Sequence, residues 1–298
     1  MFDIKQQTQN ILERSDYVTC EYRGCFDIAA KKENLLLLKT LLNVDSFQRE
    51  QAKNLKIISN NLDAHPFLIG MNMREGKLQY GIVYERFELP TVSLKTFEDL
   101  IFSSIFPRIY RDRGGFYVEI DSQILKETRK RKGMSQRELA EAVGINKKVI
   151  YEHEKKQLRM VLSIAERIEQ ILNKKIIKTV NIFKTYEEHG EPKDSIEKNV
   201  GEKLEKLGFK IDFVNKAPLD LFAKENLLMV SEIELNKRRM IKRAADLKDF
   251  IKIVNKPAIL ITEKTKEQEV LGIPLIESRN LEDLDSKELL KIAKKTVS

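Results

Sequence analysis

Apolar residues follow two kinds of spacing at both ends of the chain, and together they predict alternating strands and helices. A near-continuous apolar run at 35–42 is typical of a strand buried on both faces of a sheet, and 225–233 is also expected to form an apolar strand. Apolar positions three or four residues apart at 46–62 and 237–253 predict helices with one buried face. The pattern therefore favours an α/β fold for each end of the chain.

The order of the predicted elements is similar at the two ends. The first end is expected to hold helices at 1–14, 46–62 and 94–102, strands at 17–22, 26–30, 35–42, 67–70 and 89–93, and a hairpin with Glu75-Gly76 at its tip and 78–84 as its return strand. The other end is expected to hold helices at 195–207 and 237–253, strands at 208–213, 225–233, 256–261 and 272–276, and a last helix opening at 281–284.

Short sequence matches indicate that the two ends are copies of one unit. Residues 25–38 align with 218–230 if one residue is dropped in the turn, and 89–100 align with 273–284 without a gap. Shorter matches join 52–56 to 244–248 and 65–69 to 256–260. We interpret this as an internal duplication, with 106–115 and 174–192 as connectors to the residues between the copies and Gly114-Gly115 as a flexible break.

The stretch 135–154, SQRELAEAVGINKKVIYEHE, has the pattern of a helix-turn-helix. Ser135 and Glu138 are spaced as a capping box for a helix at 136–143. Gly144 permits the left-handed turn that ends this helix, and Asn146 is placed to cap a second helix from 147 to about 155. Aliphatic and small residues occupy the positions that would pack two helices across a tight corner: Leu139, Ala140, Val143, Ile145 and Ile150.

These residues resemble the Cro/C1 class of helix-turn-helix domains, over roughly 121–173. The flanking segments 124–132 and 161–172 suit the preceding and following helices. The whole chain resembles archaeal transcriptional regulators that carry such a domain in mid-chain. Its departures are a loop at 155–159 without the usual glycine, and lysines where glutamine, arginine or serine more often contact bases.

Charge supports a polyanionic partner. The chain carries a net charge of +8, and 121–160 holds eleven Lys or Arg against six Asp or Glu, a net of +5. A basic region that coincides with a helix-turn-helix is expected of a protein that binds double-stranded DNA. The alternative is a solvated lysine-rich surface, which is common in proteins from hot environments.

Other residue types exclude several classes of function. Cys20 and Cys25 have no cysteine or histidine cluster near them, and the three histidines are scattered, so neither a disulfide framework nor a metal site is expected. No apolar run approaches the length that crosses a membrane, and no nucleotide-binding or hydrolase motif occurs. We expect a cytoplasmic protein with no cofactor.

The resemblance assigns roles to residues of the helix-turn-helix. The outward-facing residues of the second helix would lie in the major groove of DNA: Asn146, Lys147, Lys148, Tyr151 and Glu152. Gln136 would contact phosphate at the start of the first helix, and Arg137, Lys155 and Lys156 would contact phosphates too. The same role is assigned to 129–132, with a solvated helix end as the alternative. His153 is expected to pack, and Glu154 to orient a neighbouring basic side chain.

The flanking halves resemble the restriction-endonuclease-like fold, whose nucleases need an Asp, then Glu or Gln two residues before a Lys, to hold Mg²⁺. The first half has Asp27 and Lys39 but Leu37 at the position of the second carboxylate. The other half has Asp220, with Ser231 aligned to the Lys and Glu232 and Glu234 beyond the apolar strand. Neither half holds a full set, so we expect no catalytic residues and a degenerate structural or dimerisation role.

The predicted fold is an α/β chain in which two duplicated, restriction-endonuclease-like domains, 1–113 and 181–298, flank a central all-α Cro/C1-type helix-turn-helix domain, 114–180. The predicted function is that of a DNA-binding transcriptional regulator acting as a homodimer. Two alternatives stay open. One is a nuclease or recombination factor with Mg²⁺-dependent activity abolished by Asp27→Ala, and the other is an architectural nucleic-acid binder with little sequence preference.

Overall fold

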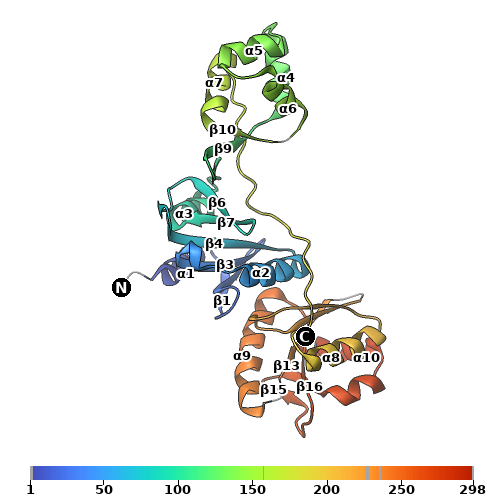
Figure 1. Ribbon diagram of the computed structural model, residues 1–298. Helices are drawn as coiled ribbons and strands as arrows, with labels where there is room; N and C mark the ends of the chain where they lie inside the picture. The colour runs from blue at the N-terminus through green and yellow to red at the C-terminus, as the bar shows by residue number, and fades with distance from the viewer. Residues whose placement is uncertain (1–2, 157, 226–227, 235, 297–298) are drawn as a thin grey trace. The chain divides into compact units, whose positions relative to one another are not determined.

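The computed structural model describes residues 3–156, 158–225, 228–234 and 236–296 (Figure 1). Contacts divide the chain into two compact units, and each is described by itself. The first unit contains Met1–Leu41, Asp45–Leu68 and Phe183–Ser298, and the second contains Leu42–Val44 and Ile69–Ile182. Phe2, an apolar residue of the helix expected at 1–14, lies outside the described residues. Among the described residues, no helix has both the length and the apolar character that a membrane crossing requires.

The N-terminal part of the first unit, called the first copy below, follows the predicted order. Its elements are α1 (Ile4–Glu13), β1 (Val18–Glu21), β2 (Ile28–Lys31), β3 (Leu35–Asn43), a 3₁₀ turn (Val44–Ser46), α2 (Arg49–Leu62) and β4 (Ala64–Met73). Leu42–Val44 and residues 69–73 of β4 are assigned to the second unit. Strands β1, β2 and β3 pair antiparallel. Residues 35–38 are almost inaccessible to solvent, as expected for a strand covered on both faces.

The C-terminal part of the first unit, called the second copy, forms a separate sheet. Its elements are α8 (Ser195–Lys206), β11 (Lys210–Phe213), β12 (Leu221–Lys224), β13 (Leu228–Ile233), α9 (Lys237–Val254), β14 (Ala258–Thr262), β15 (Glu269–Val270), β16 (Ile273–Glu277), a 3₁₀ turn (Ser278–Asp283) and α10 (Ser286–Ala293). Strands β11, β12 and β13 are antiparallel, whereas β13, β14 and β16 are parallel. The last helix begins five residues later than expected, because the 3₁₀ turn precedes it.

Strand order and hydrogen bonding support the duplication. The sheet of the second copy has the order β11-β12-β13-β14-β16-β15. The larger sheet begins β1-β2-β3-β4 and continues with β7 (Leu89–Ser93) and β6 (Ile82–Arg86). In the first copy Asp27 donates its backbone N–H to Leu38 O at 2.8 Å, and in the second Asp220 donates to Ser231 O at 2.9 Å. Ile28 pairs with Leu38 as Leu221 pairs with Ser231.

This register corrects the sequence alignment of the two copies. The expected loss of one residue in the turn is wrong, because the pairings above run without a gap. The counterpart of Lys39 is therefore Glu232 rather than Ser231. Glu232 lies within β13 and not beyond it.

The second unit contains the rest of the α/β part and the helix-turn-helix. Its strands are β5 (Gly76–Lys77), β6 (Ile82–Arg86), β7 (Leu89–Ser93), β8 (Ile109–Asp112), β9 (Gly115–Glu119) and β10 (Arg159–Val161), and its helices are α3 (Leu94–Ser103), α4 (Ser122–Arg131), α5 (Gln136–Val143), α6 (Lys147–Lys155) and α7 (Leu162–Leu172).

Two expectations for the second unit are wrong. The return strand expected at 78–84 is not continuous, because β5 ends at Lys77 and β6 begins only at Ile82. Between them, the buried Leu78 still donates its backbone N–H to Met71 O at 2.9 Å. The connector expected at 106–115 contains the β8–β9 hairpin, with Asp112 paired to Gly115. Gly114 has φ 91° and Gly115 φ 154°, so the two glycines form a tight turn rather than a flexible break.

Candidate nucleic-acid interface

The corner between α5 and α6 has the caps that the sequence predicts. The Ser135 hydroxyl accepts from the Glu138 backbone N–H at 3.1 Å, and the Glu138 carboxylate accepts from the Ser135 backbone N–H at 2.6 Å. Gly144 ends α5 in the left-handed conformation, with φ 74°. Asn146 Oδ1 accepts from the Lys148 backbone N–H at 2.8 Å and thereby caps α6. The two helices are thus fixed by local hydrogen bonds before tertiary packing is counted.

Gly144→Ala should destabilise the helix-turn-helix by about 1 kcal/mol, because an alanine Cβ strains a left-handed backbone. The added methyl would meet only the Arg167 Nη1 atom, at 3.8 Å, so crowding adds little. Gly144→Asn should cost less, since asparagine tolerates this conformation better. The stabilities of the variants are compared by urea unfolding of the full chain, in which hydrogen exchange of the α5 amides reports the unfolding of the helix-turn-helix. Equal stability of Gly144→Ala and the unsubstituted protein would contradict the assignment.

The helices enclose a core of their own. Leu139, Ala140, Val143 and Ile150 are buried there, and Ile145 packs against the cluster. The cluster also takes in β9, β10, α4 and α7 through buried residues that include Val118, Met160, Leu125 and Ile168. The packing assigned to these residues from spacing is confirmed.

His153 is buried in α6, where it packs as expected, and its Nδ1 atom has no hydrogen-bond partner among the described residues. Burial lowers the pKa of His153 below its usual 6.5, and only the Leu158 backbone and the Glu152 carboxylate oppose the shift. The imidazole is therefore neutral at pH 7.

This shift predicts a loss of stability in mild acid. The unfolded chain protonates His153 near pH 6.5, whereas the folded domain resists protonation, so stability should fall as the pH drops from about 7 toward 5. His153→Leu should reduce this pH dependence. The measurement is the midpoint of thermal unfolding of the domain at several pH values between 5 and 7.5. An unchanged slope in the variant would show that another group is responsible.

A buried ion pair, which the sequence indicates only in part, holds α4 against α6. Arg129 Nε lies 2.6 Å from Glu154 Oε1, and Arg129 Nη2 lies 3.0 Å from Glu154 Oε2. The two side chains are 7% and 4% exposed, and Arg129 Nη1 also donates to Met134 O at 2.6 Å. The orienting role expected of Glu154 is confirmed. The phosphate contact expected of Arg129 is wrong, because its guanidinium is buried and each of its three nitrogens donates a hydrogen bond within the protein.

Gln136 joins the same network. Its Nε2 atom donates to Glu154 Oε2 at 2.7 Å, so one of its two amide protons is already used. Burial alone would raise the pKa of Glu154, but hydrogen bonds from Arg129 and Gln136 hold it below the usual range. The network therefore stays ionised at neutral pH and positions Gln136 at the start of α5.

The exposed side of α6 presents two lysines without a carboxylate partner. Lys147 and Lys148 occupy the first helical turn and are exposed, and no ion pair joins either to the described part of the chain. Tyr151, one turn further on, is also exposed. The Asn146 side chain lies beside them, although its Oδ1 atom is used in the cap.

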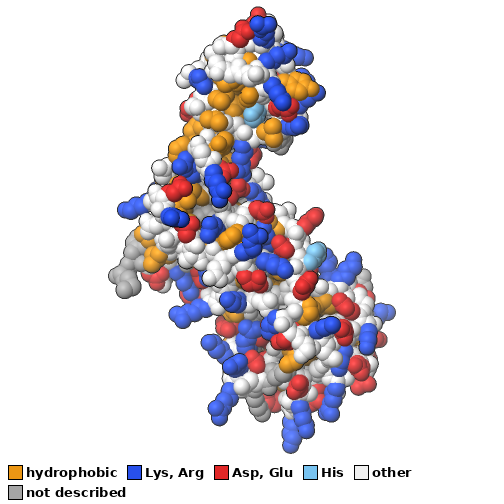
Figure 2. Space-filling view, in the orientation of Figure 1, with side chains coloured by type: hydrophobic (Ala, Val, Ile, Leu, Met, Phe, Trp, Pro, Cys, Tyr) orange, Lys and Arg blue, Asp and Glu red, His pale blue; other side chains and the backbone are white. Residues whose placement is uncertain are grey.

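The remaining predicted contact residues form pairs along their own helices. Arg137 Nε lies 2.7 Å from Glu141, and Lys156 Nζ lies 3.1 Å from Glu152. The Lys155 ammonium donates to the Tyr151 hydroxyl and lies over its ring, 4.4 Å from the centroid. Exposed pairs of this kind contribute little stability, so these side chains remain available to another partner. Figure 2 shows Lys and Arg side chains gathered where Figure 1 labels α4, α5 and α6.

The Asp27 site of the first copy is occupied by the chain's own groups. Asp27 Oδ1 lies 2.8 Å from Lys39 Nζ, and Oδ2 accepts the Thr40 backbone N–H and hydroxyl, each at 2.9 Å. Leu37 is fully buried. Divalent cations need several oxygen ligands, so a single, engaged carboxylate does not fit one. The described residues include no group of three or more His, Cys, Asp or Glu that could hold a metal ion.

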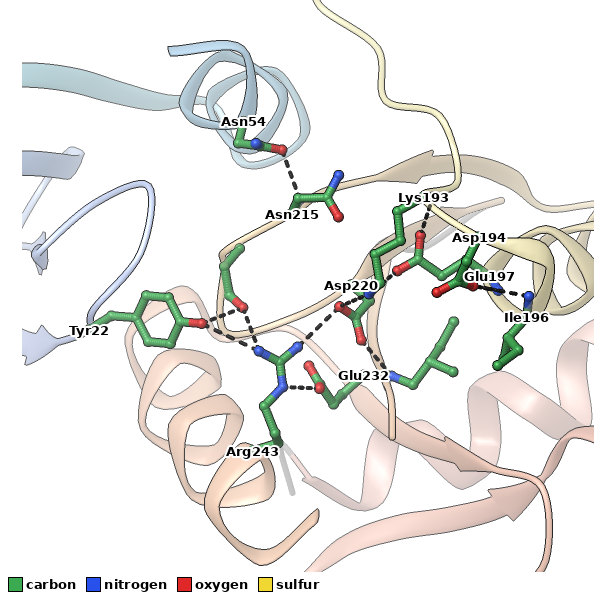
Figure 3. Close-up of polar contacts among 12 residues, drawn as sticks. Tyr22, Asn54, Lys193, Asp194, Ile196, Glu197, Asn215, Asp220, Glu232 and Arg243 are labelled. Carbon is green, nitrogen blue, oxygen red and sulfur yellow. Dashed lines mark hydrogen bonds and ion pairs between the residues drawn. The ribbon is translucent and has the colours of Figure 1, made fainter. Parts of the chain in front are cut away.

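The equivalent site of the second copy brings together charged residues that the sequence did not connect (Figure 3). Arg243 Nη2 lies 3.0 Å from Asp220 Oδ1, and Arg243 Nε donates to Glu232. Lys193 Nζ lies 3.4 Å from Asp220 and also pairs with Glu197. Burial and the nearby Asp220 raise the pKa of Glu232 well above its usual range. A charged residue in the apolar run 228–233 is the sequence signal for this cluster.

Comparison with known proteins identifies both kinds of domain. Residues 2–107 match the family model of a PD-(D/E)XK superfamily domain, and residues 125–177 match a helix-turn-helix family model. The class is therefore a helix-turn-helix protein with a nuclease-like α/β domain, which confirms the resemblances inferred for the helix-turn-helix and for the first half of the chain. No solved structure matches the chain.

Archaeal relatives match nearly the whole chain. A protein of Methanocaldococcus jannaschii is 33% identical over 275 residues, 88% of this chain and 86% of the relative. Another, of Thermococcus kodakarensis, is 32% identical over 91% of this chain and 88% of its own. A third, of Pyrococcus horikoshii, is 32% identical over 95% and 94%. Each bears the name "putative HTH-type transcriptional regulatory protein". The chain belongs to this family.

Proposed function

We propose that the protein regulates transcription by binding double-stranded DNA in the cytoplasm, with the first turn of α6 in the major groove. The observation that carries the proposal is the pair of exposed lysines, Lys147 and Lys148, which form no ion pair with the described part of the chain. They lie on a helix that the Arg129–Glu154 pair holds in place. Lysine donates to guanine O6 and N7, and the first turn of a recognition helix is the part that approaches base edges.

Neighbouring residues suit the contacts that surround such a helix. Tyr151, Glu152 and Asn146 flank the lysines. The cap uses only the Oδ1 atom of Asn146, and no described residue accepts its amide protons, which suit a base or a phosphate. Gln136 retains one amide proton at the start of α5, a position that favours an anion. Arg137, Lys155 and Lys156 are exposed at the margins and suit phosphates.

The proposal includes assembly into a homodimer, because a palindromic operator requires two recognition helices related by a two-fold axis. It keeps the division of the chain into 1–113, 114–180 and 181–298, which the family matches at 2–107 and 125–177 support. No catalytic step is assigned to the α/β copies, since Asp27 is bound to Lys39 and Thr40.

Equilibrium binding of the full chain to duplex DNA tests the proposal. We expect a defined duplex, selected from random sequence, to bind much more tightly than unrelated duplex at the same salt concentration. The complex should contain two chains by its mass. Affinity that is steep in salt but equal for all duplexes would instead favour an architectural binder.

A further inference from the structure

A pocket of ≈ 540 Å³ lies within the first unit, between α9 of the second copy and the first copy. Its volume is in the range of small-molecule sites. Residues of both copies line it, so a ligand there would contact the first and the second copy at once. The proposed DNA-binding function uses none of these residues.

One wall of the pocket is a single face of α9. Arg239, Lys242, Arg243 and Asp246 line it, and their spacing of three, four and seven residues places them on one side of a helix. Met240, Ala244 and Leu247 are buried on the other side. The sequence of α9 therefore directs three basic side chains toward the pocket.

The other wall comes from α1, β1 and the turn that follows β1, through Lys5, Glu21, Tyr22 and Arg23. The Tyr22 hydroxyl donates to Ala217 O at 2.7 Å, which holds the ring against the second copy (Figure 3). Burial raises the pKa of Tyr22 to about 12, so the phenol stays neutral at physiological pH. This wall adds a fixed aromatic side chain to the pocket.

The charges that line the pocket are not balanced. Lys5 pairs with Glu21, and Arg243 pairs with Asp220 and Glu232. Within the described part of the chain no ion pair holds Arg23, Arg239 or Lys242, and all three are exposed. Of the lining carboxylates, Asp246 remains to offset these three cations, so a net positive charge is left around the concavity, and a bound anion would reduce the repulsion.

We propose that this pocket binds a small molecule bearing a phosphate or diphosphate, held by Arg23, Arg239 and Lys242 and bridging the two α/β copies. Arginine and lysine form charge-assisted hydrogen bonds with phosphate oxygens, and the arginine fork matches them with two bonds. Asp246, at the end of the row on α9, accepts from a hydroxyl or amine elsewhere on the ligand. A long DNA backbone fits less well, because Glu21 and Asp246 also face the pocket.

Calorimetric titration of the full chain tests the proposal, with pyrophosphate, ADP and a short duplex DNA as probes. Pyrophosphate or ADP should bind one molecule per chain. Arg239→Gln/Lys242→Gln should weaken that binding by roughly tenfold or more, through loss of two charge-assisted contacts. Arg23→Gln should weaken it from the opposite wall.

The matched control is Arg238→Gln/Lys252→Gln, which removes the same charge from exposed positions of α9 outside the pocket and should leave anion affinity unchanged. Thermal unfolding confirms that each variant is folded. Absence of saturable anion binding, or equal binding by all variants, would overturn the proposal. The proposal would also be overturned if the pocket variants lost affinity for duplex DNA but kept their affinity for pyrophosphate and ADP, because the pocket would then bind nucleic acid. If the pocket variants lose anion binding but still bind the selected duplex DNA, the anion site is independent of the DNA-binding function proposed for α6.

Discussion

Lys147→Ala/Lys148→Ala should lower the affinity for the selected duplex by about 100-fold. Each well-formed contact between a side chain and a base discriminates by about 1–3 kcal/mol, and two such losses multiply in the binding constant. Both lysines are exposed and without an ion pair in the described part of the chain, so their removal should leave the fold intact. Affinity for unrelated duplex should fall much less, which narrows the gap between specific and non-specific binding.

Lys174→Ala/Lys178→Ala is the matched control for this experiment. It removes the same charge from exposed positions of the second unit that lie outside α6. Fluorescence anisotropy with labelled duplexes at fixed salt measures all three proteins. If the control loses as much affinity as the α6 variant, bulk charge rather than the recognition helix determines binding. Lys155→Ala should weaken specific and unrelated duplex alike, as expected for a phosphate contact.

Arg129→Met should destabilise the helix-turn-helix by about 3–5 kcal/mol, because it leaves the buried Glu154 carboxylate without its cation. The Glu154 side chain is only 4% exposed, so water cannot replace the lost partner. The carbonyl of Met134 loses its Arg129 donor as well. Hydrogen exchange of the α5 and α6 amides in the full chain reports this opening separately from the unfolding of the α/β parts.

The double variant Arg129→Met/Glu154→Leu should recover much of the lost stability, since no buried charge is then left unpaired. Arg131→Met, at an exposed position on the same helix, serves as the control and should have little effect. If the α5 and α6 amide hydrogens exchange at equal rates in Arg129→Met and Arg131→Met, the ion pair does not hold α4 to α6.

Local signals in the sequence predict the helix-turn-helix well. Ser135, Glu138, Gly144 and Asn146 act on backbone groups within four residues, so their roles follow from spacing alone. The Arg129–Glu154 pair joins residues 25 positions apart, and only the packed helices bring them together. A basic residue at the end of α4 therefore resembles a solvated helix end until the fold is known.

The α/β copies show a different limit of the sequence. The apolar pattern predicts the strands and helices, but it does not fix how the turns of the two copies align. A gap placed in one of these turns aligned Ser231 with Lys39, whereas the strand pairing aligns Glu232 with it. The Gly114-Gly115 pair is likewise compatible with a flexible linker and with a tight hairpin turn, and only the pairing of β8 with β9 distinguishes the two. Arg243 joins Asp220 and Glu232 from another element, which no short motif indicates.

Genome-wide occupancy of the full protein tests the regulatory role most directly. We expect discrete sites near promoters that share one two-fold symmetric sequence, and loss of these sites in Lys147→Ala/Lys148→Ala. Occupancy spread evenly over the chromosome without a shared sequence, and unchanged in that variant, would contradict it.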